Sequence, residues 1–595
     1  MRILGTAALF LSVSSLSQLA AQAPAELELL PPVIIHGDTP ATKKLADRMA
    51  ALHVPGVSIA VIHSGKIAWA RGFGVSSLGG PAVTPDTLFQ AASISKPVTA
   101  MAVMHLVQAG KIDLDTDVNQ YLKTWKVPAN RFTDQKKITM RELLTHTAGM
   151  TVHGFPGYAS DAPLPTLVQV LNGEKPANTA AIRVDIAPGT EWRYSGGGFV
   201  VAQLLLQDLT GKPFPAFMKE TVLGPAGMTL STYQQPLPAD RMKEAAMAYG
   251  QNGKAIVGGP HVYPEMAPAG LWTTPSDLAR YAMEIQKALA GSSAVLSAAT
   301  AREMLKPGIG KWGIGIGTGG SAAHPYFEHS GANEGFQCNM VAYNNGDGAV
   351  IMTNSDSGGQ LAAEILRTIA HDNHWPDFAP REIQKRKDPV SSETLNRYAG
   401  VYAIAPGAYM TISVADGQLV SQMSHQSGLP LMAESETTFS AKTIDAQIEF
   451  PAGEKGSASQ LILHQNGRET TAKRLGDAEA KAIVDAAADF DRRFKSQTAA
   501  PGTEAAVRHL IEGARTGRPD YGRMSPGLAN VTRQQLSELQ PMIANMGAVQ
   551  SVNFKGVGPG GADIYQVKFE KGSLDYRVWL TPDGKIESAN FRPSE

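Results

Sequence analysis

Ser93 and Lys96, in the stretch QAASISKP, have the residue types and the spacing of a nucleophile and its base. A serine hydroxyl is a poor nucleophile until a base takes its proton. A neutral lysine can do so if burial or a nearby positive charge lowers its pKa well below about 10.4. A spacing of three places both side chains on one helix face. Such a pair arises about once by chance in a chain of this length, so these residues alone favour a capping serine and a solvated lysine.

A tyrosine follows in the stretch RYSGGG, where Tyr194 precedes Ser195 and Gly196. A phenol both donates and accepts hydrogen bonds, so Tyr194 can relay a proton between the nucleophile, the lysine and a leaving group. The alternative is a buried aromatic side chain beside a glycine turn. The stretch adds a candidate proton carrier.

The stretch FEHSGANEGFQ contains His329, Ser330, Gly331 and Ala332 in succession. A serine hydroxyl beside a polar or cationic side chain can hold a substrate carboxylate. Glycine permits close approach of the backbone, and the N–H of Ala332 can then face a substrate carbonyl. The alternative is a histidine at a strand edge followed by a turn.

These three stretches stand in the order of the motifs of penicillin-recognising serine hydrolases, whose usual forms are S-x-x-K, Y-x-N and K-T-G. The tyrosine version resembles the class C β-lactamase branch, which includes esterases, D-amino peptidases and D,D-carboxypeptidases. The flanks VPGVSIAVIHSGKI, ITMRELLTHTAGM, VLGPAGMT and APAGLWTTPSDLARYA also resemble that branch. The resemblance covers about residues 30–370.

The resemblance implies that Ser93 is acylated, with Lys96 as the base or sharing the proton with Tyr194. The N–H groups of Ser93 and Ala332 would form an oxyanion hole, in which one donor lowers the barrier by roughly 2.7–4 kcal/mol. The substrate-binding residues would be His329, Ser330 and Gly331, with the first two at the acyl or carboxylate end. Water would then release the acyl group.

Other residues of the matching segments are interpreted as structural. His146 in LLTHTAGM would bond or cap the backbone near the site, and Trp272 in GLWTTP would pack. The mechanism that the resemblance implies needs no metal, and the chain has no H-E-x-x-H stretch. We also expect no cofactor. The chain has no G-x-S-x-G elbow either, which excludes the α/β-hydrolases.

Two residues depart from the family pattern. Gly196 replaces the asparagine of Y-x-N, whose amide would bond the lysine or the substrate. His329 replaces the lysine of K-T-G, and an unperturbed histidine, with a pKa near about 6.5, would make carboxylate binding depend on pH. Both changes favour peptide or ester hydrolysis over β-lactam turnover.

Three functions remain open. The first is an exported serine hydrolase that forms an acyl-enzyme on Ser93 and cleaves an amide or ester bond in a D-amino peptide, a small ester or a β-lactam. The second, suggested by Gly196, is a catalytically weak penicillin-binding or peptidoglycan-fragment-sensing protein. The third is a scaffold whose C-terminal domains carry the function.

Composition bounds the partners and the compartment. The 595 residues carry a net charge of −1, which argues against nucleic acid. Arg2, an apolar run and small residues near position 21 predict a signal peptide over 1–21, hence a periplasmic or secreted bacterial protein without a transmembrane anchor in the mature chain. The single cysteine, Cys338, allows no disulfide within the chain and reads as a buried thiol. The oligomeric state stays open.

The elements that must position the site are two hairpins and a helix. The first hairpin is predicted from alternating apolar residues on both sides of a turn at Ser64-Gly65. The second hairpin is predicted over 336–354. The helix after Ser93 has Val98, Met101, Ala102, Leu106 and Val107 on one face and ends at Gly110. Further helical runs cover 141–145, 199–210 and 276–289. We therefore predict an α+β hydrolase domain over 27–378, an antiparallel sheet flanked by helices plus an all-helical region.

Two smaller domains are predicted beyond a Pro- and charge-rich linker at 376–392. Short alternating strands over 393–475, with turns at Asp416-Gly417 and Asn466-Gly467, indicate a small barrel or sandwich. This segment resembles the lipocalin-like β-barrel often attached to such hydrolases. Helical and then alternating runs over 477–595 indicate a small α+β domain, in which Thr503 is predicted to cap a helix. This segment resembles small cystatin-like or nuclear-transport-factor-like domains. The domain at 477–595 shows no catalytic constellation.

Overall fold

A computed structural model of the chain separates it into two compact units. One unit comprises residues up to 32 together with 39–380, and the other comprises 33–38 together with 381 onward. The structure describes residues 26–405, 408–424, 426, 428–451, 456–465, 468–558, 560–581 and 583–594. The predicted signal peptide at 1–21 and the turn at Asn466-Gly467 lie outside the described residues.

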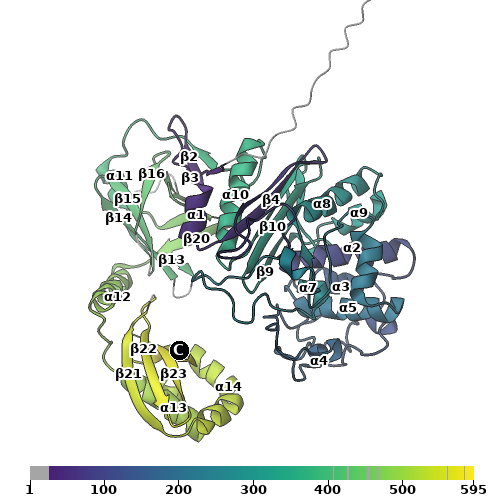
Figure 1. Cartoon of the computed structure of the whole chain (residues 1–595). Coiled ribbons are helices and arrows are strands. Elements are labelled where there is room, and N and C mark those ends of the chain that lie inside the picture. The colour runs from purple at the N-terminus through teal and green to yellow at the C-terminus, as the bar shows by residue number, and fades with distance from the viewer. Residues whose placement is uncertain are drawn as a thin grey trace, which may run out of the picture. The chain divides into compact units, whose positions relative to one another are not determined.

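A six-stranded antiparallel sheet forms the centre of the first unit, in the order β5-β4-β11-β10-β9-β8 (Figure 1). Its strands are β4 (Gly56–His63), β5 (Lys66–Gly74), β8 (Gly317–Gly320), β9 (Pro325–Asn333), β10 (Phe336–Tyr343) and β11 (Gly348–Thr353). Both predicted hairpins are confirmed. The first turns at Ser64 and Gly65, which both have positive φ angles as a tight hairpin turn requires.

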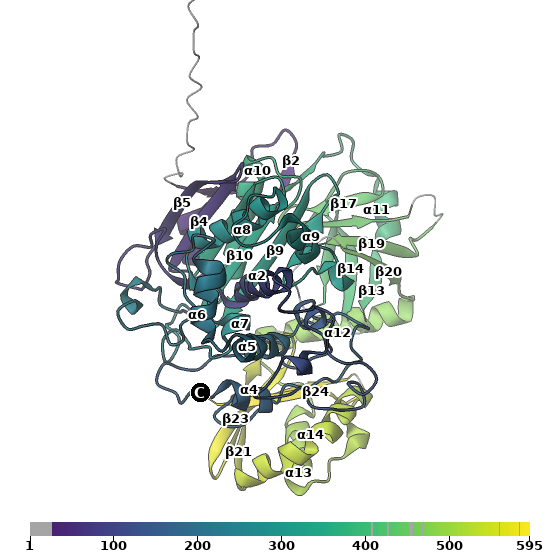
Figure 2. The ribbon, with the colours of Figure 1, turned by 90° about the vertical axis from the view of Figure 1, so that its right-hand side faces the viewer.

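Helices cover both faces of this sheet because its strands alternate two apolar sets. Val57, Ile59 and Val61 pack with α1 (Leu45–Ala51) and α10 (Gly358–Asp372) in one core cluster. Ala60 and Ile62 belong to the other cluster, which includes α8 (Pro275–Leu289). Figure 1 shows α1 and α10 on one side of the sheet and the larger group of helices on the other. In Figure 2 this larger group, with α2, α5, α8 and α9, faces the viewer.

The all-helical region surrounds α2 (Ser95–Gln108), the helix that follows Ser93. Its other helices are α3 (Met140–Leu144), α4 (Leu167–Asn172), α5 (Gly196–Thr210), α6 (Phe214–Met218), α7 (Met266–Ala269) and α9 (Ala298–Met304). The helix predicted after Ser93 is confirmed, but its burial extends beyond the predicted apolar face, since every residue from Ser95 to Met104 is buried. The helix is buried from several sides by α7, α9 and the π-turn Lys219–Leu223, so its polar positions are enclosed too.

Short elements complete the first unit. They are β1 (Glu28–Leu29), β3 (Lys43–Lys44), β6 (Phe89–Gln90), β7 (Trp272–Thr273) and the 3₁₀ turns η1 (Ala92–Ile94), η2 (Val118–Gln120), η4 (Met242–Glu244) and η5 (Ile309–Lys311). Strand β6 pairs with β7, which brings the chain just before Ser93 beside residues 272–273.

The second unit opens where the sequence predicted only a linker. Residues Arg381–Ile383 form β12, which pairs in parallel with β2 (Val33–Ile35). The prediction of a linker without regular structure is therefore wrong at this strand. Three residues are too few to show a period, and their partner comes from the opposite end of the hydrolase segment.

A closed eight-stranded barrel follows the helix α11 (Ser392–Tyr398), as the predicted fold class requires. Its strands are β13 (Gly400–Ala405), β14 (Ala408–Ala415), β15 (Gln418–Met423), β16 (Leu429–Ala433), β17 (Thr438–Ala441), β18 (Ala446–Glu449), β19 (Gln460–Gln465) and β20 (Arg468–Arg474). Pairing of β13 with β20 closes the barrel and leaves no edge strand. Side chains of the strands, among them Tyr402 and Phe439, fill the interior.

The last region is α+β, as predicted. Its elements are α12 (Asp477–Ser496), α13 (Thr503–Thr516), the 3₁₀ turn η6 (Tyr521–Arg523), α14 (Pro526–Asn545), β21 (Val549–Val557), β22 (Asp563–Phe569), β23 (Gly572–Leu580) and β24 (Ile586–Pro593). The strands form one antiparallel sheet. Thr503 is not the cap of α13, because Gly502 holds that position and the Thr503 hydroxyl bonds Asp563 and Tyr565 instead.

None of the helices in the described part of the chain has the length and apolar character needed to span a bilayer.

Candidate active site

Ser93 lies in the 3₁₀ turn η1, directly before α2, at a place where three backbone segments meet. The preceding Ala92 has a left-handed φ of 49°, which turns the chain sharply into the helix. Strand β9 packs against this turn. A Cβ on Gly331 would lie 2.3 Å from the Ala91 carbonyl oxygen, so only glycine lets β9 come this close. The thiol of Cys338 donates a hydrogen bond to the same carbonyl at 3.0 Å.

Lys96 lies one helical turn after Ser93 and is 2% exposed. Its Nζ is 3.0 Å from Ser93 Oγ and donates to the Pro268 carbonyl at 3.0 Å. Burial lowers the pKa of Lys96 to about 7. In the described part of the chain no carboxylate pairs with it. A large fraction of the amine is therefore neutral near neutral pH, within reach of the serine proton.

Tyr194 lies two residues before the start of α5, and it lines the site. Its phenol hydrogen-bonds Ser93, and burial raises its pKa above the ordinary value. The Lys96 Nζ lies 4.8 Å from the centre of the Tyr194 ring. Because its pKa is raised, the phenol keeps its proton at neutral pH and serves as a donor to the groups around Ser93.

His146 packs against the Tyr194 ring and bonds the backbone of the next residue. Its Nδ1 accepts a hydrogen bond from the Ser195 backbone N–H at 3.1 Å, and its ring lies 4.3 Å from the Tyr194 ring. Burial and the charge of Lys96 hold the pKa of His146 well below its ordinary value. This placement agrees with the structural role that the sequence suggested.

His329 is 4% exposed, and its Nδ1 lies 2.6 Å from the carbonyl oxygen of Ser330. A carbonyl can only accept, so Nδ1 carries the proton and Nε2 is left as an acceptor. Burial and the charge of Lys96 lower the pKa of His329 to about 3. The expectation of a histidine that titrates near pH 6.5 is wrong, because the closed site disfavours the imidazolium.

Ala332 lies on a free edge of β9. Strand β8 pairs with β9 only as far as Gly317 opposite Glu328. Among the described strands, β10 is then the one neighbour of residues 329–333. Among the described strands, the backbone groups of this stretch that do not face β10 have no strand partner.

A cavity of about 720 Å³ contains the predicted site. Its lining residues are Ser93, His153, Trp192, Arg193, Tyr194, Trp312, Glu328, His329, Ser330, Gly331, Ala332, Gln337 and Asn339. The structure thus brings together every residue predicted from the motifs, with Lys96 joined through Ser93. A volume of this size accommodates a small organic or peptide substrate.

Sequence reasoning missed the aromatic and acidic part of the cavity wall. Trp192 and Glu328 are close neighbours of the motif residues Tyr194 and His329, and that proximity was the available signal. Trp312 comes from a loop with no motif and lies 5.5 Å from the Trp192 ring. Trp272, in contrast, is buried against Phe336, in agreement with its predicted packing role.

Gly196 is tightly enclosed. A Cβ at this position would lie 2.9 Å from a Phe155 ring carbon and 3.2 Å from the His153 carbonyl oxygen. The place where the family pattern has an asparagine side chain is thus occupied by neighbouring residues. No side-chain amide from this position can reach Lys96.

The family model described as beta-lactamase matches residues 41–373, which is more than half of the chain. This chain belongs to the beta-lactamase family. It is therefore a serine hydrolase by family, with the six-stranded sheet and the helical region of that fold. A second model, a domain of unknown function designated DUF3471, matches residues 384–477, where the barrel lies.

Several known proteins are similar to this chain. Penicillin-binding protein 4* of Bacillus subtilis (strain 168) is 22% identical over 456 residues, which are 72% of this chain and 97% of that protein. The unguisins hydrolase ungD' of Aspergillus campestris is 34% identical over 186 residues, 30% of this chain and 33% of that protein. The octameric penicillin-binding protein homologue from Pyrococcus abyssi has a TM-score of 0.46 at 20% identity, covering 72% of this chain and 98% of that structure.

Proposed function

We propose that this chain is an exported serine hydrolase that cleaves an amide or ester bond through an acyl-enzyme on Ser93. The observation that carries the proposal is the contact of 3.0 Å between Ser93 Oγ and Lys96 Nζ. The lysine is buried, and its pKa is lowered to about 7. A surface lysine near a capping serine would have neither property, so the structural alternative for this pair is disfavoured.

In the first step Lys96 takes the proton of the Ser93 hydroxyl while Oγ attacks the substrate carbonyl carbon. The Pro268 carbonyl holds the amine by accepting one of its N–H groups, which leaves the lone pair free for Ser93. The oxyanion that forms would accept hydrogen bonds from the N–H groups of Ser93 and Ala332. The position of Ala332 on the free edge of β9 supports this role.

Collapse of this intermediate expels the amine or alcohol, which must receive a proton. Tyr194 is the suitable donor, because its phenol bonds Ser93 and its pKa is raised. The phenol is then reprotonated from Lys96, so the proton taken from Ser93 restores Tyr194 while the tyrosine's own proton leaves with the product. In the second step water attacks the ester carbonyl and gives a proton to the same pair. The bond to Ser93 Oγ then breaks, the pair returns the proton to Oγ, and the acid is released.

His329, Ser330 and Gly331 are proposed to shape the acyl side of the cavity. His329 is neutral here, so it contributes an acceptor at Nε2 rather than a positive charge. The absence of a cation at this position and of a side chain at Gly196 supports peptides and esters over β-lactams as substrates. All of this chemistry falls within the proposed catalytic domain at 27–378, and export would depend on residues 1–21.

Covalent labelling tests the proposal most directly. We expect the purified protein to be labelled by a fluorescent organophosphonate and to hydrolyse p-nitrophenyl esters. Ser93→Ala should abolish labelling and lower kcat by about 10⁴-fold or more, because the nucleophile acts as a unit with its base. Ser95→Ala is the matched control, since the Ser95 hydroxyl accepts the Leu271 N–H inside the fold and is not part of the cavity lining.

Labelling and turnover that persist in Ser93→Ala would refute the proposal. A stoichiometric burst of product without further turnover would instead favour the alternative, a catalytically weak penicillin-binding or peptidoglycan-fragment-sensing protein. The missing amide at Gly196 is the feature that keeps this alternative open. A parallel assay with nitrocefin and D-Ala peptides separates the substrate classes.

A further inference from the structure

The cavity wall contains one carboxylate without a partner. Glu328 lines the cavity, and among the described residues nothing donates a hydrogen bond to it or forms an ion pair with it. Burial alone shifts its pKa, upward. In strand β9 it alternates with the buried Phe327 and His329, so it shares a face with Ser330 and Ala332. A half-buried carboxylate without a cation is an unfavourable arrangement unless a ligand provides the cation.

Aromatic rings lie next to this carboxylate. A Cβ on Gly317 would lie 3.4 Å from Glu328 Cγ and also 3.4 Å from a six-membered-ring carbon of Trp312, so the two side chains flank the same hollow. The Trp312 ring lies 5.5 Å from Trp192 and 6.1 Å from Tyr194. Indole faces combined with a carboxylate are the surface that binds ammonium groups.

The cavity lining contains one arginine and no lysine. Arg193 binds Asp185 and the Gly149 carbonyl through its guanidinium. His329 is neutral, and Lys96 is buried behind Ser93. A substrate carboxylate would thus meet Glu328 with no lysine and no unpaired arginine in the lining to offset the repulsion. A substrate cation would instead meet a negative charge and aromatic faces.

We propose that the cavity selects substrates that carry a cationic ammonium group, bound between the Glu328 carboxylate and the Trp312 ring. This inference rests on the proposed function, because it names the substrate class of the same site. Glu328 precedes Ala332 by four residues, which is roughly 13 Å along the strand. The ammonium group would therefore be separated from the scissile carbonyl by several bonds rather than lying next to it.

Matched esters test this selectivity. The probes are p-nitrophenyl esters of a six-carbon acid whose far end carries a trimethylammonium, a tert-butyl or a carboxylate group. For the full-length protein we expect kcat/KM of the cationic ester to exceed that of the neutral ester by about tenfold. The carboxylate ester should fall below the neutral one.

Two variants locate the effect. Glu328→Gln should reduce the ratio of cationic to neutral kcat/KM to near one, and Trp312→Leu should reduce it as well. Glu334→Gln is the matched control, because Glu334 lies in the same hairpin, is exposed and is absent from the cavity lining. That variant should keep the wild-type ratio. A wild-type ratio near one, or an equal fall in both glutamate variants, would overturn the inference.

Failure of the proposed function is recognised separately. If Ser93→Ala abolishes hydrolysis of the neutral ester, the hydrolase assignment stands whatever the charge preference is. If no ester is turned over, calorimetric titration of the wild-type protein with hexyltrimethylammonium decides the inference alone. Saturable binding that weakens about tenfold in Glu328→Gln supports it. No binding, or equal affinity in both proteins, refutes it.

Discussion

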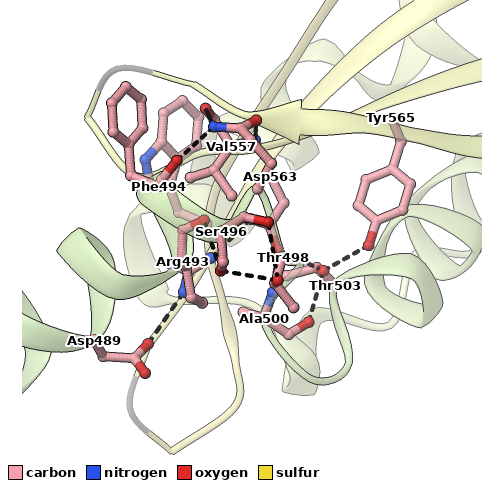
Figure 3. Close-up of polar contacts among 12 residues, drawn as sticks. Asp489, Arg493, Phe494, Ser496, Thr498, Ala500, Thr503, Val557, Asp563 and Tyr565 are labelled. Atoms are coloured by element: carbon pink, nitrogen blue, oxygen red, sulfur yellow. Dashed lines mark hydrogen bonds and ion pairs between the residues drawn. The ribbon is translucent and has the colours of Figure 1, made fainter.

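Lys96 in the first unit and Asp563 in the last α+β region are both almost fully withdrawn from solvent, yet only Asp563 has an ionic partner. Asp563 is 1% exposed, and its carboxylate receives Arg493 at 2.8 Å, the Ala500 N–H at 2.6 Å and the Thr503 hydroxyl at 2.8 Å. The Thr503 hydroxyl also contacts Tyr565 at 2.8 Å, as Figure 3 shows.

The groups around Lys96 are satisfied far less completely. The lysine has a hydroxyl and a carbonyl as partners, and both His146 and His329 keep a buried Nε2 without a hydrogen bond in the described structure. Buried polar groups without partners destabilise a fold. The same desolvation lowers the pKa of Lys96 and readies it as a base. The polar cluster around Asp563 stabilises its region. The incompletely bonded groups around Lys96 instead lower the stability of the fold and make the lysine a better base.

Among the replacements that test this contrast, that of Lys96 should have the largest effect on activity. Lys96→Met should lower kcat by about 10³-fold, because the general base is lost. In the wild type, kcat/KM should rise about tenfold per pH unit up to the lysine pKa near 7 and then level off. Lys111→Met, at an exposed lysine just after the same helix, should leave the profile unchanged.

The Lys96→Met variant should also be more stable than the wild type. The unfolded chain keeps the lysine proton up to about pH 10.4, whereas the native state releases it near 7, so native Lys96 costs most below pH 7 and nothing above pH 10. At pH 7 we expect Lys96→Met to raise the free energy of unfolding by about 1–4 kcal/mol, with the gain vanishing toward pH 10. A thermal melt that shows destabilisation at pH 7 would contradict this account.

Removal of the buried acid should have the opposite result. Asp563→Ala leaves Arg493 without its partner and should destabilise the last region by about 3 kcal/mol, while kcat stays at the wild-type value. Hydrogen exchange of the β22 and β23 amides measures the loss. Asp491→Ala, at an exposed position on α12, is the control and should change exchange little. Unchanged protection in Asp563→Ala would show that the cluster is not stabilising.

The smallest expected effect comes from a single hydroxyl of the same cluster. Thr503→Val keeps the shape of the side chain and removes its hydrogen bond to Asp563, which retains Arg493 and Ala500. A loss of about 1 kcal/mol follows from a bond to a group that keeps other partners. The same exchange measurement should place this variant between the wild type and Asp563→Ala. A loss as large as that of Asp563→Ala would mean that Thr503 acts through packing.

Much of the fold was predictable because its signals are local. Alternating apolar residues and the Ser64-Gly65 turn predicted the first hairpin, and the positive φ angles at that turn confirm it. The strand Arg381–Ile383 was not predictable, because it depends on a partner at Val33–Ile35. The enclosure of α2 on all sides was missed for a related reason, since a helical period shows apolar positions and not how many neighbours surround them.

The residue types and their order along the chain are enough to name the residues that can do the chemistry. The spacing of Ser93 and Lys96 already places them one helical turn apart, and the later Tyr194 and His329 motifs made the family resemblance visible. The protonation states of Lys96 and His329, in contrast, depend on the tertiary structure. Desolvation depends on side chains that arrive from distant segments, so neither the lowered pKa of Lys96 nor the neutral His329 can be inferred from spacing. The placement of Glu328 beside Trp312 in the cavity wall is set in the same way, by packing.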